Sequence, residues 1–163
     1  MRIVLPIVFY APYWGVCWLA TGSDKKNLAG LRSYPDAVQR QVRARMDAPA
    51  EKSMPAILTG NLVLFTVVFS ALGLVFRRAL GLSGYLDAFC YFLAFGEGLG
   101  LFDLVVIDLL WWRNTKRIRF SFLPERQAYQ DPRKHLGSFW RGIPLFAAIA
   151  ALTAAIVSAA SGF

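Results

Sequence analysis

Hydrophobic residues in this chain fall into four long blocks, and strongly charged segments separate one block from the next. The blocks cover approximately residues 3–20, 54–76, 85–112 and 139–160. A helix of about 20 apolar residues crosses the ~30 Å hydrocarbon core of a bilayer. The pattern therefore predicts an all-α membrane protein, with four transmembrane helices in two hairpins that form a single domain over residues 1–163.

The composition argues against an ordinary water-soluble domain. Hydrophobic residues make up 56% of the chain, charged residues only 17%, and the mean hydropathy is +0.45. Soluble domains rarely combine these values. The longest polar stretch, residues 23–53, is too short to add a separate soluble domain of useful size.

The basic residues predict the orientation of the helices. Of the 18 Lys and Arg residues, seven lie in the loop 23–53 and eight lie in or just beyond the loop 113–138. Only Arg2, Arg77 and Arg78 lie on the other side. The positive-inside rule therefore places both loops in the cytoplasm and both termini outside, as in a multi-pass protein of a bacterial cytoplasmic membrane. This distribution explains the pI near 9.9 by contact with anionic lipids, and it disfavours nucleic acid as a partner.

The first block has two interpretations, a retained span and a signal peptide. Arg2 and the small residues near Ala20 fit a signal peptide. Prolines and aromatic residues interrupt the apolar run, and this favours a retained span. They are Pro6, Tyr10, Pro12, Tyr13, Trp14 and Trp18.

Short helices are predicted in both cytoplasmic loops. From Pro35 to Met46, apolar residues recur every fourth position and arginines occupy the other faces. This pattern is typical of an interfacial amphipathic helix on the inner membrane surface, and equally of a solvated connecting helix. In the second loop, residues 117–122 alternate between polar and apolar, which indicates an extended segment along the membrane. A short helix is predicted over 124–130, and Asp131-Pro132 predicts the start of the helix that leads into the last span.

Four carboxylates make the block 85–112 unusual. It has 28 residues and would extend ~42 Å as a helix, so Asp87 and Asp108 are expected to reach the two interfaces. Glu97 and Asp103 remain within the hydrocarbon region. A charge there costs at least ~2.5–3.5 kcal/mol, so such groups usually face a protein interior, a wet cavity or a functional site.

Depth along the helices suggests partners for the two buried acids. Counted from the cytoplasmic ends, Asn61 lies at the height of Asp103, and Thr66 to Ser70 lie at the height of Glu97. Oxygen-rich groups of this kind suit protons and hard cations. The sequence therefore predicts an ion or proton site formed by Glu97, Asp103 and Asn61. The alternative is that these groups only hydrogen-bond to one another and lock the hairpin.

A second candidate site lies at the cytoplasmic interface. Asp108, Glu125, Tyr129 and the single histidine, His135, would form a carboxylate–imidazole cluster for a metal or for acid–base chemistry on a lipid headgroup. No zinc, phosphate-binding or serine-hydrolase motif is present. Cys17 and Cys90 are predicted to lie at different depths and to stay unpaired. No cofactor is predicted, and the metal is left unassigned.

These features lead to three functional hypotheses. The first is a small transporter or transport-accessory subunit with buried carboxylates as a proton or cation site. The second is a membrane-embedded enzyme that acts on a lipid or isoprenoid headgroup. The third is a structural or assembly subunit of a larger membrane complex. Four spans shield two acids poorly, so self-association or a partner membrane subunit is expected, through glycines 96–100 and the alanine stripe 147–159.

Overall fold

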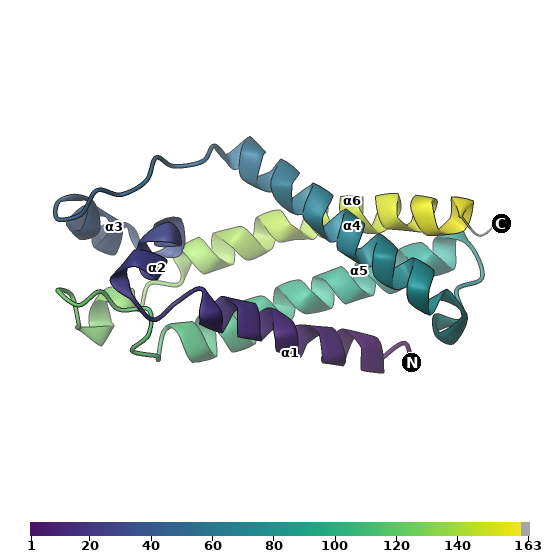
Figure 1. The fold of residues 1–163 in the computed structure, drawn as a ribbon, viewed down its shortest axis with the longest axis horizontal. Coiled ribbons are helices and arrows are strands. Elements are labelled where there is room, and N and C mark those ends of the chain that lie inside the picture. Colours follow the sequence, from purple (N-terminus) through teal and green to yellow (C-terminus); the bar gives the residue numbers. More distant parts are fainter. Residues whose placement is uncertain (161–163) are drawn as a thin grey trace. The chain divides into compact units, whose positions relative to one another are not determined.

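The computed structural model describes residues 1–160, which form helices and loops with no β-strand (Figure 1). The all-α prediction is therefore confirmed for these residues. The chain divides into two compact units, each built from segments far apart in the sequence. The first unit contains Met1–Phe9, Lys52–Gly100 and the chain from Trp140 onward; the second contains Tyr10–Glu51 and Leu101–Phe139.

The first unit is built around the long helix α4, Met54–Leu80, and the helix α5, Tyr85–Phe102. The ends of α4 follow from its sequence. The Ser53 hydroxyl accepts a hydrogen bond from the Ala56 amide at the N-terminus, with a proline in the first turn. Gly81 ends the helix in the left-handed conformation, with φ of 61°.

Gly81 and Leu82 close the turn between α4 and α5. The Gly81 amide donates to the Arg78 carbonyl, and the Leu82 amide donates to the Arg77 carbonyl. This is the Schellman arrangement, which satisfies carbonyl groups that a helix end leaves free. It produces a tight connection between the two helices.

Aromatic rings form the core of the first unit. Phe69 of α4 is fully buried and stacks on Phe95 of α5 at 4.7 Å between ring centroids. Phe146 comes from α6, Arg133–Ala159, and Phe9 comes from the first part of α1, Val4–Leu19. The packing depends on glycine, because a Cβ on Gly96 would lie 2.7 Å from Phe146.

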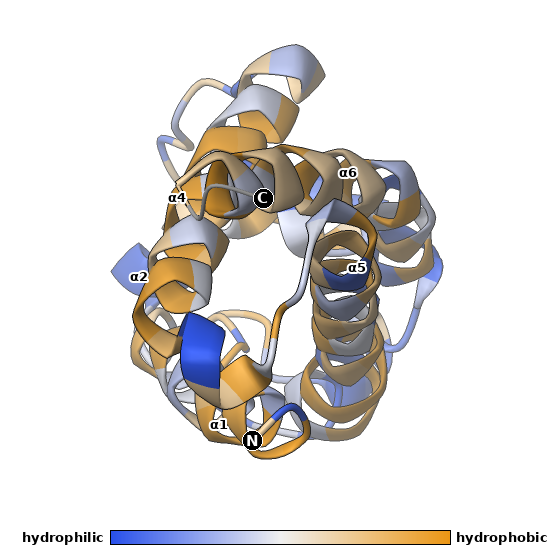
Figure 2. Ribbon diagram, turned by 90° about the vertical axis from the view of Figure 1, so that its right-hand side faces the viewer, coloured by the Kyte–Doolittle hydropathy of each residue, from blue (hydrophilic) through white to orange (hydrophobic). Residues whose placement is uncertain are grey.

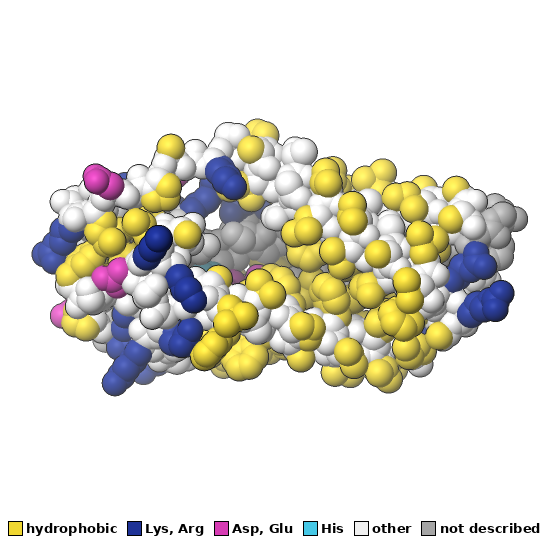
Figure 3. Space-filling model, viewed as in Figure 1, with side chains coloured by type: hydrophobic (Ala, Val, Ile, Leu, Met, Phe, Trp, Pro, Cys, Tyr) yellow, Lys and Arg dark blue, Asp and Glu magenta, His cyan; other side chains and the backbone are white. Residues whose placement is uncertain are grey.

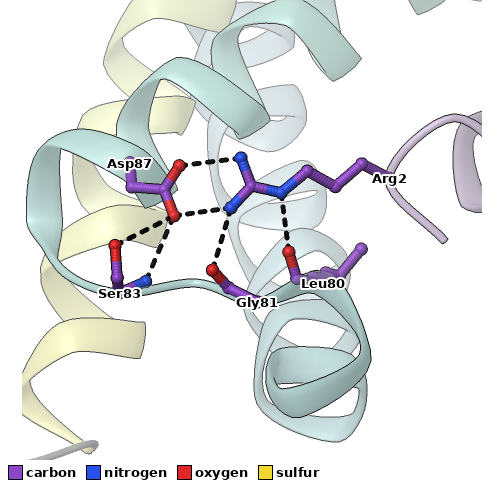
Figure 4. A network of polar contacts seen from close by, with 5 residues as sticks. All are labelled: Arg2, Leu80, Gly81, Ser83 and Asp87. Carbon is purple, nitrogen blue, oxygen red and sulfur yellow. Dashed lines mark hydrogen bonds and ion pairs between the residues drawn. The ribbon is translucent and has the colours of Figure 1, made fainter.

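A salt bridge fixes the first residues of the chain to this turn (Figure 4). The Arg2 guanidinium donates to both carboxylate oxygens of Asp87, at 2.8 and 2.7 Å. It also donates to the carbonyls of Leu80 and Gly81, at 2.6 and 2.9 Å. The planar guanidinium suits this two-pronged contact, so Asp87 has a structural partner that sequence reasoning did not identify.

Two helices in residues 1–160, α4 and α6, are long and apolar enough to cross a membrane, and α1 is apolar but shorter. The surface of α4 fits this reading, since Val63, Leu64, Val67 and Val75 are each more than half exposed. Figure 2 colours α4 mainly as hydrophobic, and Figure 3 shows apolar side chains gathered along it. Water disfavours such a continuous apolar surface, whereas lipid accepts it.

The second unit contains the loops that the sequence places between the spans. Its short elements are α2, Asp24–Ala29; η1, Leu31–Ser33; α3, Asp36–Arg43; and η3, Arg126–Tyr129. They surround a shared hydrophobic core that also includes Trp112. The buried members are Leu31, Tyr34, Val38, Val42, Trp112, Ile118, Phe120, Leu123 and Tyr129.

This core corrects the expectation that α3 lays its apolar face on the membrane. Val38 and Val42 are fully buried by the protein itself. Ile118 and Phe120, expected to follow the membrane surface, are also fully buried in the same core. The apolar side chains of the two loops bury one another, so Val38, Val42, Ile118 and Phe120 are shielded from water without lipid.

Buried polar groups hold the two loops in register. The Tyr34 hydroxyl donates to the Ile118 carbonyl at 2.8 Å, and the Asn27 amide donates to the Arg117 carbonyl at 3.0 Å. The Tyr129 hydroxyl accepts from the Phe120 amide and donates to the Leu123 carbonyl. Each bond joins a side chain to a backbone group of the second loop.

Helix α5 continues directly into a π-helix, η2, Asp103–Trp112. The amide of Arg113 donates to the carbonyl of Asp108, five residues earlier, as this wider helix requires. The sequence by itself predicts a regular α-helix throughout this block. The π-helix changes which side chains share a face, and this is decisive for the site.

Candidate functional site

A cavity of about 420 Å³ lies within the second unit. Its walls come from the C-terminal end of α1, the loop around η1, the π-helix η2 and the first turns of α6. The residues that give it chemical character are Asp103, Asp108 and His135, together with Trp111, Trp112 and Tyr34.

His135 and Asp108 form the closest polar pair in this cavity. His135 Nδ1 lies 2.8 Å from Asp108 Oδ2. The side chains are 5% and 15% exposed, so water screens the contact little. The ring of Trp112 packs against the imidazole, with 4.8 Å between centroids. Asp108 thereby fixes the orientation of the imidazole ring.

The other imidazole nitrogen, Nε2, makes no hydrogen bond to the described residues. His135 Nε2 is buried and has no hydrogen-bond partner in the described part of the chain. When Nδ1 donates to Asp108, Nε2 carries the lone pair and acts as a hydrogen-bond acceptor. A buried nitrogen in that state can take a proton from a molecule bound in the cavity and later return it.

Asp103 also lines the cavity, and it forms a second polar pair with Tyr13, which does not line it. The Tyr13 hydroxyl donates to Asp103 Oδ1 at 3.3 Å. Asp103 and Asp108 are five residues apart, which would separate them by about 140° on an α-helix. In a π-helix residue i bonds to residue i+5, so both carboxylates reach the same cavity.

The predicted interfacial cluster of Asp108, Glu125, Tyr129 and His135 is reduced to two members. Glu125 is exposed and does not line the cavity. Tyr129 is fully buried in the loop core, and burial raises the pKa of its phenol. Its hydroxyl is engaged by backbone groups, which gives it a structural role.

The predicted ion site of Glu97, Asp103 and Asn61 stays a prediction. Glu97 and Asn61 belong to the first unit, whereas Asp103 belongs to the second. Glu97 Oε1 is buried and has no hydrogen-bond partner among residues 1–160, and the same holds for the hydroxyls of Thr66 and Ser70. The structural alternative requires every polar atom of Glu97 to be hydrogen-bonded. In the described residues, Glu97 Oε1 has no such bond.

The sequence does not predict that Tyr13 bonds to Asp103, or that Asp103 and His135 line the same cavity. Tyr13 carries no motif, and it meets Asp103 only because segments 90 residues apart pack together. In residues 1–160, no group of three or more His, Cys, Asp or Glu side chains is arranged to hold a metal ion. Cys17 and Cys90 are both free thiols.

Comparisons of the chain with protein-family models, with curated proteins and with solved structures found no match.

Proposed function

We propose that this is a four-span membrane protein whose His135–Asp108 pair performs acid–base chemistry on the headgroup of a lipid or isoprenoid at the cytoplasmic interface. One observation carries the proposal. A buried imidazole that lines the cavity is held by a carboxylate at 2.8 Å, and its second nitrogen has no hydrogen-bond partner among residues 1–160. Positioned general bases of this kind typically accelerate reactions by about 10²–10⁴-fold.

The membrane part of the proposal combines sequence and structure. The helices α4 and α6 are suitable spans. The helix formed by α5 and η2 supplies the third, and α1 supplies the first, with both termini outside the cytoplasmic membrane of a bacterium. Figure 3 shows Lys and Arg side chains gathered over the loops of the second unit, which suits the anionic inner leaflet. Self-association through the alanine stripe 147–159 belongs to the same proposal.

Each residue has a defined part in this chemistry. His135 Nε2 accepts a proton from the bound molecule, and Asp108 stabilises the imidazolium that results. The ring of Trp112 packs at a steep angle against the imidazole ring and excludes water from that side of it. Asp103, held by Tyr13, supplies a second carboxylate within the same cavity.

The test compares lipid extracts of cells that express the wild type, His135→Gln, Asp108→Asn or Asp47→Asn. We expect the wild type to change the amount of at least one lipid or isoprenoid headgroup species, measured by mass spectrometry. His135→Gln and Asp108→Asn should reduce that change at least tenfold. Asp47 is an exposed carboxylate in the loop of the same unit, so its variant should match the wild type. Identical extracts from the wild type and the His135→Gln cells would remove the proposal.

A second candidate function is ion or proton transport, and a specific observation favours it. Glu97 Oε1 is buried in an apolar unit and has no hydrogen-bond partner in the described chain. Such a group is a site for a proton or a cation. If this function is right, Glu97→Gln and Asp103→Asn should abolish pH-dependent flux in proteoliposomes. Unchanged flux in both folded variants would rule it out.

A further inference from the structure

We infer that the cavity of the second unit binds an organic cation, a molecule that carries a primary or substituted ammonium group. This inference rests on the proposed function for what happens to the bound molecule, because it names the substrate class of the same site. The binding itself follows from the charges and aromatic walls of the cavity and from the unpaired nitrogen of His135, a residue that lines it.

The charges that line the cavity favour a positive ligand. Asp103 and Asp108 both line it, and each has only one carboxylate oxygen in a side-chain contact within the described residues. The cationic side chain on the wall, Lys26, is exposed, and its ammonium group donates to the Leu19 carbonyl at 2.9 Å. A phosphate group would meet two carboxylates at close range, which costs Coulomb energy in a partly buried site.

The aromatic residues add a second feature of cation recognition. Trp111, Trp112 and Tyr34 all line the cavity. The rings of Tyr34 and Trp112 are packed against each other at 4.8 Å, so their positions are fixed before a ligand arrives. Aromatic faces attract organic cations through the negative charge of the ring surface, and carboxylates beside them strengthen the attraction.

The free nitrogen of His135 completes the set of acceptors. An ammonium group carries only donors, and Nε2 is a buried acceptor without a partner in residues 1–160. A ligand N–H that bonds to Nε2 would remove the cost of leaving this nitrogen unpaired. Bound this way, the ammonium group is in the position from which His135 can take its proton.

The experiment uses the full-length protein in lipid nanodiscs made of phosphatidylglycerol. Tryptophan fluorescence is recorded while ethylammonium, 1-propanol or propionate is added. These probes have similar size and carry a positive, a neutral and a negative head, respectively. We expect a saturable change with ethylammonium, and none with the other two. Asp103→Asn and Asp108→Asn should weaken ethylammonium binding at least tenfold, and Asp47→Asn should leave it unchanged.

A second arm separates a lipid source of the ammonium group from a soluble one. Nanodiscs of mixed phosphatidylethanolamine and phosphatidylglycerol are analysed by native mass spectrometry. Retention of phosphatidylethanolamine by the wild type but not by Asp108→Asn identifies a lipid headgroup. Binding of free ethylammonium without lipid retention identifies a soluble amine. Either result supports the inference.

Three results would overturn it: no saturable ethylammonium binding together with no lipid retention, equal binding of propionate, or full binding by both asparagine variants. If the asparagine variants do not fold, Asp103→Glu keeps the charge and should bind within about threefold of the wild type.

Amine binding with unchanged lipid extracts in His135→Gln cells would remove only the proposed enzymatic function. Altered extracts without amine binding would remove only this inference.

Discussion

At the scale of single residues, the second unit depends on polar side chains that are buried and paired with backbone. Tyr34 is the clearest case, since its ring is 2% exposed and its hydroxyl donates to the Ile118 carbonyl. Burial raises the pKa of this phenol, so Tyr34 remains a hydrogen-bond donor through neutral pH. The same residue also lines the cavity, so fold and site share one side chain.

Replacing Tyr34 with phenylalanine should destabilise the second unit by about 1–3 kcal/mol, because the Ile118 carbonyl is then buried without that donor. The measurement is thermal unfolding of the purified protein in detergent. Tyr85→Phe is the matched control, because Tyr85 is 44% exposed. Equal midpoints for the two variants would show that the buried hydrogen bond contributes nothing.

Asp36 and Lys134 form a pair that links α3 to the first turn of α6, next to His135. The distance from Lys134 Nζ to Asp36 Oδ1 is 2.6 Å. The hydrogen bond from Lys134 lowers the pKa of Asp36 below its ordinary value of 3.8. A carboxyl with a lowered pKa stabilises the fold above its unfolded pKa, and this contribution is lost as the pH falls through the folded pKa.

We therefore expect the wild type to lose a small increment of stability as the pH falls below about 3.8, and Asp36→Asn to lack this increment. Asp36 is largely exposed and Lys134 is partly exposed, so the effect should shrink in high salt. Unfolding curves recorded between pH 3 and 7, at low and high salt, test this. Parallel curves for the two proteins would contradict the role assigned to the pair.

At the scale of elements, close packing in the first unit depends on glycines at helix contacts. A Cβ on Gly73 of α4 would lie 2.7 Å from Val157 and 2.9 Å from Phe92. On the same helix, a Cβ on Gly60 would meet no heavy atom within 4 Å. Gly73 is therefore required for close helix packing, whereas Gly60 is not. The local sequence around the two glycines does not reveal this difference.

Gly73→Ala should destabilise the protein by about 1–3 kcal/mol through overpacking. Gly60→Ala should be neutral or stabilising by up to about 1 kcal/mol, because alanine favours the helix more than glycine does. Unfolding of both variants in detergent by denaturant gives the comparison. If Gly73→Ala is as stable as Gly60→Ala, the helices are not packed as closely as described.

The π-helix is the element that defines the site. It brings Asp103 and Asp108 to the same cavity, where an α-helix would direct them apart. Such segments often occur at functional sites. The first turn of α6 then supplies His135, and the Asp131 carboxylate caps that turn by accepting from the Arg133 amide at 3.0 Å.

At the scale of the whole molecule, the proposed topology has a direct test. With four spans, the C-terminus lies outside and the loop around Asp47 lies in the cytoplasm. Alkaline phosphatase is active only outside the cytoplasm, so a fusion at the C-terminus should be active. A truncated fusion after Asp47 should be inactive, with equal expression of both shown by immunoblot. The reverse pattern would invert the topology, and two active fusions would remove the four-span arrangement.

Much of the fold could be predicted from the sequence, because the relevant signals are local. Block lengths, the Ser53 and Asp131 caps and the turn at Gly81 each act within a few residues. The site was predicted only in part. Asp108 and His135 were expected at the same interface, and they do form a pair. Glu125 and Tyr129 were grouped with them by spacing alone, and the loop core gave them other surroundings.

The sequence by itself determined that the chain is helical and strongly apolar, because hydrophobic periodicity and length are written in consecutive residues. Only the tertiary structure decided that the loops share a core, that α5 widens into a π-helix, that Asp103, Asp108 and His135 line one cavity, and that Tyr13 bonds to Asp103. These features arise from contacts between segments far apart in the chain; Tyr13 and Asp103, for example, are 90 residues apart. Side-chain packing sets such contacts, and no local pattern encodes them.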